Sequence, residues 1–359
     1  MDTSLTATAA VDQVFPNDGT DLLGWDMIKA IQIFQNGGPD VLQLGDTELA
    51  PPGPGEVRIR HGAIAVNYSD VNVRTGGFYI AEPLDFPVII GNEAAGVIEE
   101  LGDGAEGVQV GERTAYVGVG GPFYENTGAY AEARNVPASC LFKLPGKISD
   151  DQAAAMMLKG LTASMVIHRY CKPGPGDAVL IHGAASGVGL LLVQWCKHLG
   201  ATVIGTVGSE AKAGVARSLG CNHTILYRDV DFVSAVKDIV PDGVVAVLDG
   251  VGKDTFAQSI LCTRRYGTLV NYGNASGHPD PLDLLLLAKH GSLSVTRPAF
   301  SDHIREARDR AHYSDELYDL VASGVLKVEI GKSYPLAQAA DAHRDMERRK
   351  YAGSLLLKP

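Results

Sequence analysis

The chain has 359 residues, enough for about two domains, and its 45% hydrophobic and 20% charged residues are those of an ordinary globular protein. Its formal net charge of −11 argues against a nucleic-acid partner, because phosphate backbones bind basic surfaces. The five cysteines are scattered without C-x-x-C spacing, which argues against a disulfide framework or structural zinc and favours a reducing, cytoplasmic compartment. Neither a signal peptide nor a membrane span is recognisable, so no membrane partner is expected.

The N-terminal half begins with a polar, acidic stretch, residues 1–26, that is expected to form an extension. Residues 27–149 then carry short alternating segments interrupted by glycine and proline, such as EVRIRHGAIAV and VIIGNEAAGVIEELG. Alternation of this kind is typical of half-buried strands. We therefore predict a β-rich domain over this range.

The period changes at Asp150, where two aspartates can cap a helix that runs through AAAMMLKGLTASMVIHRYC. Beyond it, apolar strands and amphipathic helices alternate from AVLIHG to GTLVNYG. Such β–α alternation predicts a parallel, doubly wound sheet over residues 150–297, so the fold class is α/β. Residues 298–359 are polar and helical first and strand-like at the end.

A phosphate-binding turn is predicted between Gly183 and Gly189, after the strand AVLI and before a helix. Small residues let the backbone approach a pyrophosphate, and the helix N-terminus supplies free N–H groups and positive dipole charge. The strict G-x-G-x-x-G spacing is not kept, because Ala184 and Ser186 stand at the first two glycine positions. The flanking strand, helix and second strand still indicate a dinucleotide site.

The second strand of this unit selects the nucleotide. It ends in Val207-Gly208-Ser209 without the acidic residue that binds the ribose of NAD, and Lys212 follows three residues later. Tyr227 and its neighbouring arginine come after the third strand. A hydroxyl with a cation suits a 2′-phosphate, so NADPH is the expected cofactor, provided that Glu210 points away.

Seven blocks of the chain together resemble a known family. In chain order they are VNYSDVNVRTGG, GNEAAGVIEELG, MLKGLTA, HGAASGVGLLLVQW, DGVGKDTF, YGNASG and GSLSVTRP. The chain resembles the NADPH:quinone oxidoreductases of the medium-chain dehydrogenase/reductase superfamily, the group that includes zeta-crystallin. The resemblance implies a GroES-like domain over 27–149 and 298–359, a Rossmann domain over 150–297, an active site between them, and a homodimer paired through the 244–298 region of the Rossmann sheet.

Three positions bear on metal chemistry. Zinc-dependent relatives carry Cys, His and Cys where this chain has Asn67, Asn92 and Lys159. Zinc prefers thiolate and imidazole ligands, so the resemblance implies a site without metal and without alcohol dehydrogenase chemistry.

The resemblance also implies roles for single residues. Asn67 and Lys159 would lie near the nicotinamide and the substrate. The remaining cofactor contacts are expected from Asn72, Ser186, Gly187, Val188, Ser209, Lys212, Tyr227, Tyr272, Gly273, Asn274, Ala275, Val295, Thr296, Arg297 and Arg349.

The substrate pocket departs from the family pattern, since Asn72 replaces a usual tyrosine. Tyr68 or Tyr79 is a candidate hydroxyl instead, either as pocket wall or as proton donor. Three functions stay open: reduction of quinones or other conjugated carbonyls, reduction of enones or enoyl thioesters such as 2-alkenals or enoyl-CoA, and a non-catalytic NADPH-binding role. The sequence names neither the physiological acceptor nor one- versus two-electron transfer.

Overall fold

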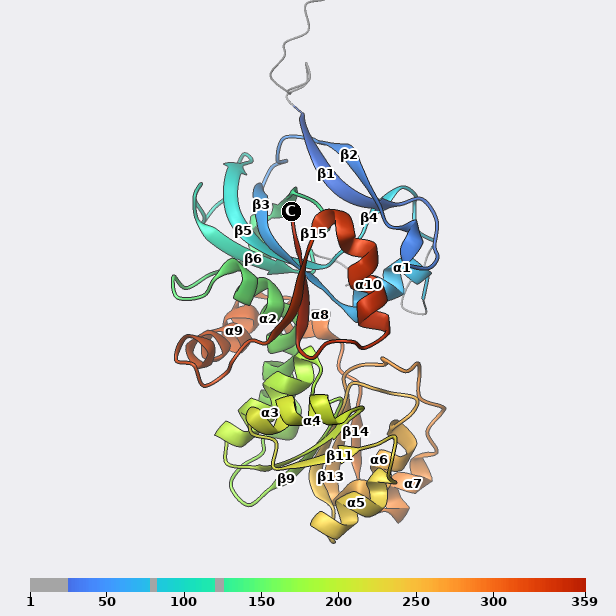
Figure 1. The fold of residues 1–359 in the computed structure, drawn as a ribbon. Helices are drawn as coiled ribbons and strands as arrows, with labels where there is room; N and C mark the ends of the chain where they lie inside the picture. Colours follow the sequence, from blue (N-terminus) through green and yellow to red (C-terminus); the bar gives the residue numbers. More distant parts are fainter. Residues whose placement is uncertain (1–24, 78–82, 120–125) are drawn as a thin grey trace, which may run out of the picture.

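The computed structural model describes residues 25–77, 83–119 and 126–359, and Figure 1 shows them as two lobes with helices between them. Of the predicted extension 1–26, only the last two residues fall within the described ranges, and strand β1 begins at Asp26. In the described part, every helix is too short or too polar to traverse a lipid bilayer.

The first lobe is built on a sheet with strand order β15-β16-β3-β5-β6-β8, and β7 also pairs with β3. The long strand β3 is almost wholly buried, because its apolar residues face cores on both sides. A smaller sheet has the order β2-β1-β4. The strands are β1 (Asp26–Ile33), β2 (Gln43–Leu49), β3 (Glu56–Val66), β4 (Val88–Ile89), β5 (Glu93–Leu101), β6 (Arg113–Val117), β7 (Ala133–Pro137), β8 (Leu141–Lys143), β15 (Ile330–Pro335) and β16 (Ser354–Lys358).

The C-terminal segment returns to this first lobe, where β16 pairs antiparallel with β3 and aligns Leu355 with Val66. Helix α10 lies beside α1 on the outside of the lobe (Figure 1). The helices of this lobe are η1 (Pro39–Val41), α1 (Tyr68–Thr75), η2 (Ala138–Cys140), η4 (Leu336–Gln338) and α10 (Ala339–Glu347).

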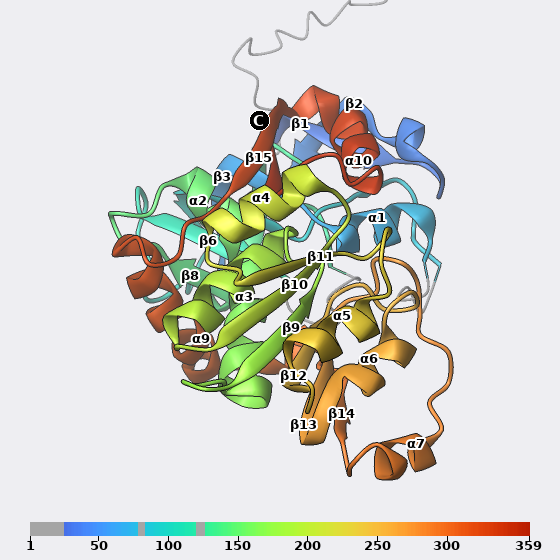
Figure 2. The same ribbon diagram turned by 60° about the horizontal axis from the view of Figure 1, so that its bottom comes forward.

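The second lobe is a parallel sheet with the order β11-β10-β9-β12-β13-β14, which confirms the predicted doubly wound α/β class (Figure 2). Of the predicted pairing region, only β14 lies at a sheet edge, because β12 and β13 are flanked on both sides. The elements are β9 (Ala178–His182), α3 (Gly187–His198), β10 (Thr202–Val207), α4 (Glu210–Ser218), β11 (His223–Leu226), α5 (Phe232–Ile239), β12 (Val244–Asp249), α6 (Phe256–Cys262), β13 (Thr263–Asn271), α7 (Leu284–Lys289) and β14 (Ser294–Thr296).

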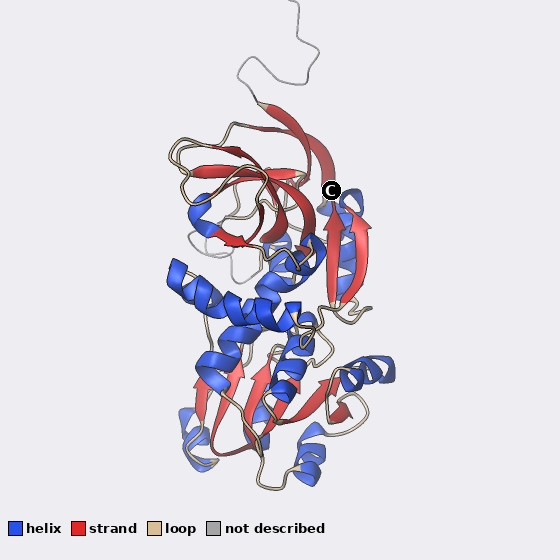
Figure 3. Cartoon of the chain, turned by 90° about the vertical axis from the view of Figure 1, so that its left-hand side faces the viewer, coloured by secondary structure: helices blue, strands red, loops and turns tan. Residues whose placement is uncertain are grey.

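Helices between the lobes join the two sheets, as Figure 3 shows from the side. They are α2 (Asp150–Met165), the π-helix η3 (Val166–Cys171), α8 (Phe300–His303) and α9 (Ala307–Ala322). The predicted aspartate cap of α2 was wrong, because Ser149 accepts a hydrogen bond from the Gln152 N–H at 3.2 Å and Gln152 reciprocates. One hydrophobic core contains residues of α2 and of both sheets, so α2 is held from two sides.

Three buried histidines predict instability in acid. Burial lowers the pKa of His61 to about 4 and the pKa values of His182 and His343 to about 3. Each is therefore neutral in the folded chain and charged when unfolded below about pH 6.5. Their contribution is complete above pH 6.5 and is lost as the pH falls toward 3, so we expect the melting temperature to drop steadily from pH 7 to pH 5.

The His182→Gln variant should show a flatter dependence of melting temperature on pH, measured by circular dichroism. Substitution of the exposed His290 by glutamine is the control and should leave the slope unchanged. Asp70 acts with the opposite sign, because burial raises its pKa to about 6 and its protonated form favours the fold between pH 4 and 6. A melting temperature that rises on acidification would mean that Asp70 outweighs the histidines.

Candidate active site

The predicted phosphate turn joins β9 to α3. Ser186 is the N-cap of α3 and its Oγ accepts a hydrogen bond from the Gly189 N–H at 3.1 Å. Gly183 has a φ of 67°, and a Cβ on Gly189 would lie 2.2 Å from the Gly183 carbonyl oxygen. The turn therefore needs glycine for its close backbone approach, and the N–H groups of Gly187 and Val188 in the first turn of α3 have no partner within the helix, as an anion site requires.

We expect Gly189→Ala to disrupt the turn, since backbone atoms lie where its Cβ would be. The expected result is a melting temperature several degrees lower, from a loss of roughly 2 kcal/mol, together with weaker NADPH binding. Gly214→Ala in α4 is the matched control, because nothing lies within 4 Å of its added Cβ. That variant should gain roughly 0.5–1 kcal/mol of stability and bind NADPH normally, as read by nucleotide fluorescence.

Asn67 and Lys159 are brought together, from the N-terminus of α1 and from the middle of α2. The Lys159 ammonium donates to Asn67 Oδ1 at 2.7 Å and to Glu93 Oε1 at 3.2 Å, and Asn67 Nδ2 donates to the same Glu93 oxygen at 2.8 Å. All three side chains are buried. The cluster is thus a neutralised ion pair bridged by an amide, the form in which burial of charge is tolerated.

Glu93 is the member of this cluster that sequence reasoning missed. It is the first residue of β5, and its Oε2 accepts the Leu158 N–H at 2.6 Å, so it also anchors α2 beside Lys159. The available signal was an acidic residue at the start of the otherwise apolar strand EAAGVI.

Lys159 also lies against the phosphate turn. A Cβ on Gly187 would come within 2.6 Å of Lys159 Cδ, so the absence of a side chain there makes room for the lysine stem. The C-terminal segment closes the same region, because the Gly353 N–H donates to the Ala185 carbonyl at 3.3 Å. The turn and the Lys159–Asn67 pair therefore lie together in one region of the structure.

A cluster of cations surrounds the end of β10. Lys212 Nζ donates to the Arg349 carbonyl at 2.5 Å. Burial, followed by the charges of the nearby Arg349 and Arg228, lowers the pKa of Lys212. Glu210 is paired with Arg217 further along α4 and so points away from the cations. The prediction of NADPH required this orientation.

Arg349 lies between this cluster and the helix that follows Asn67. Its backbone φ is 52°, and its Nη2 donates to the Ala275 carbonyl at 3.2 Å. Burial opposes its charge, but the nearby Tyr68 and Tyr227 outweigh that effect and raise the pKa of the guanidinium. Tyr68 directly follows Asn67, so Arg349 reaches both lobes.

The segment Tyr272–Ala275 folds back over the end of β12. The Tyr272 N–H donates to the Asp249 carbonyl at 2.9 Å and the Ala275 N–H to the Gly250 carbonyl at 3.2 Å, which places Gly273 and Asn274 at the same edge. Val295 and Thr296 lie in β14, and Arg297 Nη1 donates to the Asn271 carbonyl at 2.9 Å.

The remaining predicted residues are placed by their elements. Ser209 is the N-cap of α4, and Val188 lies in the first turn of α3. Asn72 follows Tyr68 by four residues on α1, so the two share a helix face. Tyr79 lies outside the described residues.

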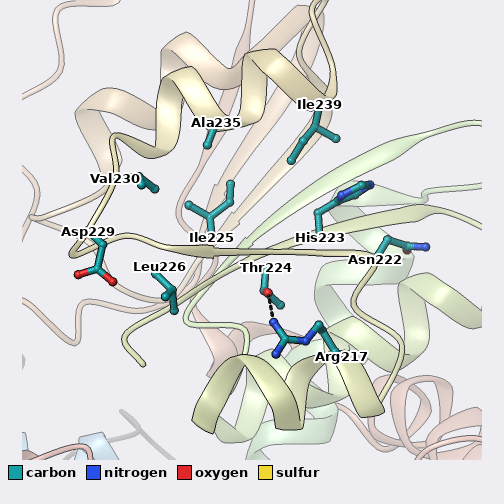
Figure 4. A pocket seen from close by; sticks show the side chains of 10 residues that line it. All are labelled: Arg217, Asn222, His223, Thr224, Ile225, Leu226, Asp229, Val230, Ala235 and Ile239. Atoms are coloured by element: carbon teal, nitrogen blue, oxygen red, sulfur yellow. Dashed lines mark hydrogen bonds between the residues drawn. The ribbon is translucent and has the colours of Figure 1, made fainter. Parts of the chain in front are cut away.

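The three described ranges contain no group of three or more His, Cys, Asp or Glu residues suited to a metal ion. An open hollow of about 500 Å³ lies beside the edge strand β11, between α4 and α5, and Figure 4 shows the side chains that line it. Its lining includes Arg217, Thr224 and Ile239 but none of the predicted cofactor residues, so it is separate from the site built above.

Comparison with known proteins agrees with this architecture. Residues 53–146 match the alcohol dehydrogenase GroES-like domain, and residues 187–312 match the zinc-binding dehydrogenase family. The chain is 42% identical to a 2-haloacrylate reductase from a Burkholderia species, over 93% of this chain and 99% of that protein. It is 39% identical to a quinone oxidoreductase from Salmonella typhimurium, over 93% of this chain and all of that one.

A solved structure of the Escherichia coli quinone oxidoreductase complexed with NADPH superposes with a TM-score of 0.87 at 38% identity, covering 92% of this chain and 100% of that one. Identity of this extent over nearly whole chains goes beyond a shared fold. The chain therefore belongs to the quinone oxidoreductase family of the medium-chain dehydrogenase/reductase superfamily.

Proposed function

We propose that this protein uses NADPH to reduce quinones or other carbon–carbon double bonds conjugated to a carbonyl. The residues present fit the cofactor: Ser186 and Gly187 at the start of α3 would hold the pyrophosphate, and Lys212 and Arg349 the 2′-phosphate. The observation that carries the proposal is the placement of the Lys159–Asn67–Glu93 cluster directly against the phosphate turn.

NADPH supplies the hydride, which this family's acceptors receive on a conjugated carbon. Reduction leaves negative charge on the acceptor oxygen, and the protein must stabilise it. Within the described residues, Lys159 spends two of its three ammonium protons on Asn67 and Glu93, and the third is available to that oxygen. Asn67 holds the ammonium in place, and Tyr68, the candidate hydroxyl, directly follows Asn67 at the start of α1.

The acceptor class is the finer part of the proposal. Similarity to quinone oxidoreductases makes quinones the first candidate acceptors of this protein. Similarity to a 2-haloacrylate reductase, at 42% identity, makes a small conjugated acid the second candidate. A panel of 1,4-benzoquinone, 2-chloroacrylate and an enoyl-CoA, each with NADPH and with NADH, separates these by the loss of absorbance of the reduced nicotinamide.

We expect oxidation of NADPH with benzoquinone and a much slower reaction with NADH. Turnover of 2-chloroacrylate alone would move the assignment to the second candidate, and turnover of the enoyl-CoA to a thioester reductase. Binding of NADPH without turnover of any acceptor would contradict the enzymatic proposal and leave the non-catalytic role.

The exposed edge of the Rossmann sheet supports a homodimer. Strand β14 is the sheet edge on this side, and the preceding helix α7 exposes Leu284 by 72% and Leu285 by 65%. Exposed leucines beside an open strand edge are typical of an interface. We expect a dimer by light scattering and a monomer for the double variant L284D/L285D, with the exposed Val110 of the other lobe changed to aspartate as the control.

The domain boundaries 27–149, 150–297 and 298–359 and the cytoplasmic location also remain proposals. Five free cysteines support a reducing compartment for the protein. Limited proteolysis with and without NADPH tests the boundaries, since cleavage concentrates between independently folded units.

A further inference from the structure

A chain of buried hydrogen bonds leads from the C-terminal helix α10 to the loop that carries Asn67. Arg74 Nη1 contacts His343 Nδ1 at 3.0 Å, His343 Nε2 contacts the Tyr130 hydroxyl at 2.9 Å, and that hydroxyl contacts Asp70 Oδ2 at 3.1 Å. None of the four side chains is more than 1% exposed. At the outer end Arg74 pairs with Glu347 of α10, and in Figure 1 α10 lies beside α1.

The direction of this chain is fixed by arginine. A guanidinium only donates, so His343 Nδ1 must accept and its proton must be on Nε2. His343 Nε2 then donates to the Tyr130 oxygen, and the Tyr130 proton goes to Asp70. Burial and the charge of Arg74 lower the pKa of His343 to about 3, in keeping with a neutral imidazole. Because Arg74 keeps its proton, this row of hydrogen bonds cannot carry protons from Arg74 to Asp70.

Asp70 is surrounded by donors. Its Oδ2 accepts the Asn67 N–H at 2.8 Å and the Tyr130 hydroxyl, and its Oδ1 accepts Asn92 Nδ2 at 3.0 Å and faces the Ser69 hydroxyl at 3.5 Å. Four donors occupy the lone pairs of a carboxylate, so protonation must displace one of them. Asp70 thus fixes the backbone of Asn67 and the side chain of Asn92, and the side chain of Asn67 in turn holds Lys159.

We propose that Arg74, His343 and Tyr130 are positioning residues for the active site, acting through the Asp70 carboxylate on Asn67 and Asn92. This inference rests on the proposed function. It deepens that function by making one residue of α1, one residue of the C-terminal helix α10 and one loop tyrosine determinants of rate, although none belongs to the cluster that would touch substrate. Asn92 Oδ1, buried and without a partner in the described residues, is the atom whose direction Asp70 sets.

The proposal predicts how the rate depends on pH. Burial raises the pKa of Asp70 to about 6, hydrogen bonds from Asn67, Asn92 and Tyr130 oppose this, and the charge of Glu93 adds to it. Other charged groups around α1 include Arg74, Glu347 from α10, Lys159 from α2 and Arg349 beside Tyr68. Loss of the Tyr130 donor should make Asp70 easier to protonate, so the site should fail at a higher pH.

The test is the pH profile of kcat/KM with benzoquinone. In Tyr130→Phe the acid limb should move upward by about one pH unit, so the ratio of variant to unaltered rate falls as the pH is lowered. His343→Leu should behave in the same way, and His343→Gln should restore the original limb, because an amide can accept from Arg74 and donate to Tyr130. Tyr334→Phe is the matched control. It removes a buried hydroxyl that donates to Asp345, which lies on α10 like His343 but outside the chain of hydrogen bonds.

A second readout needs no turnover. The infrared carboxyl band of Asp70, assigned by its loss in Asp70→Asn, should titrate at a higher pH in Tyr130→Phe than in Tyr334→Phe. A Tyr130→Phe profile lowered equally at every pH, or the same upward shift in Tyr334→Phe, would overturn the positioning role. Absence of turnover in the unaltered protein would instead contradict the proposed function, with the infrared result still deciding the chain of hydrogen bonds.

Discussion

Replacing Lys159 with methionine is expected to lower kcat about 100-fold, the loss typical of removing one preorganised donor to a developing oxyanion. The lysine ammonium is buried, and Asn67 and Glu93 hold it in one position against Gly187. Methionine keeps the length of the stem but has no proton to donate. The measurement is kcat with saturating NADPH and benzoquinone at pH 7.5, together with the melting temperature.

The same variant leaves the Glu93 carboxylate buried without its cation, which we expect to cost about 3 kcal/mol of stability. The double variant Lys159→Met/Glu93→Gln separates the two effects, since the amide can still accept the Leu158 N–H that Glu93 accepts now. It should regain most of the melting temperature without regaining the rate. Recovery of both would mean that Lys159 only balances Glu93 and does not act on the acceptor.

The parts of the site that the sequence predicted are those encoded by local spacing. The turn from Gly183 to Gly189 is set by its flanking strand and helix, and Lys212 follows β10 by a fixed number of residues. The doubly wound sheet follows from β–α alternation for the same reason. Lys159 was found through the family resemblance, and the structure places it beside Asn67.

The parts that were missed depend on contacts between distant segments. Glu93 lies 26 residues from Asn67, and His343 lies 269 residues from Arg74. Nothing local marks His343, because a polar residue in a short amphipathic helix is ordinary on a surface and only the packing of α10 buries it. The predicted edge region, residues 244–298, was too broad for a related reason. Only β14 lies at the sheet edge, because strand order is a property of the whole sheet and not of local sequence.

Selection of NADPH over NADH should depend on Lys212. We expect Lys212→Ala to raise the KM for NADPH by about 10- to 100-fold, as for loss of one charge-assisted hydrogen bond, and to leave the KM for NADH nearly unchanged. The reason is the mutual repulsion of Lys212, Arg228 and Arg349, which lowers the pKa of Lys212. The 2′-phosphate dianion of NADPH would offset this repulsion, and NADH has no such group. High salt should reduce the preference for NADPH in the unaltered protein for the same reason.

Lys237→Ala on α5 is the matched control, because it changes the net charge by the same amount. The Lys237 ammonium lies at the C-terminal end of α5, where it donates to the Pro241 carbonyl. It should leave both KM values unchanged. Lys212 also donates to the Arg349 carbonyl, so its removal takes one hydrogen bond from a residue whose backbone φ is positive. If Lys212→Ala weakens NADH and NADPH equally, the lysine supports Arg349 rather than the 2′-phosphate, and the choice between the nucleotides must lie with Arg228 and Tyr227.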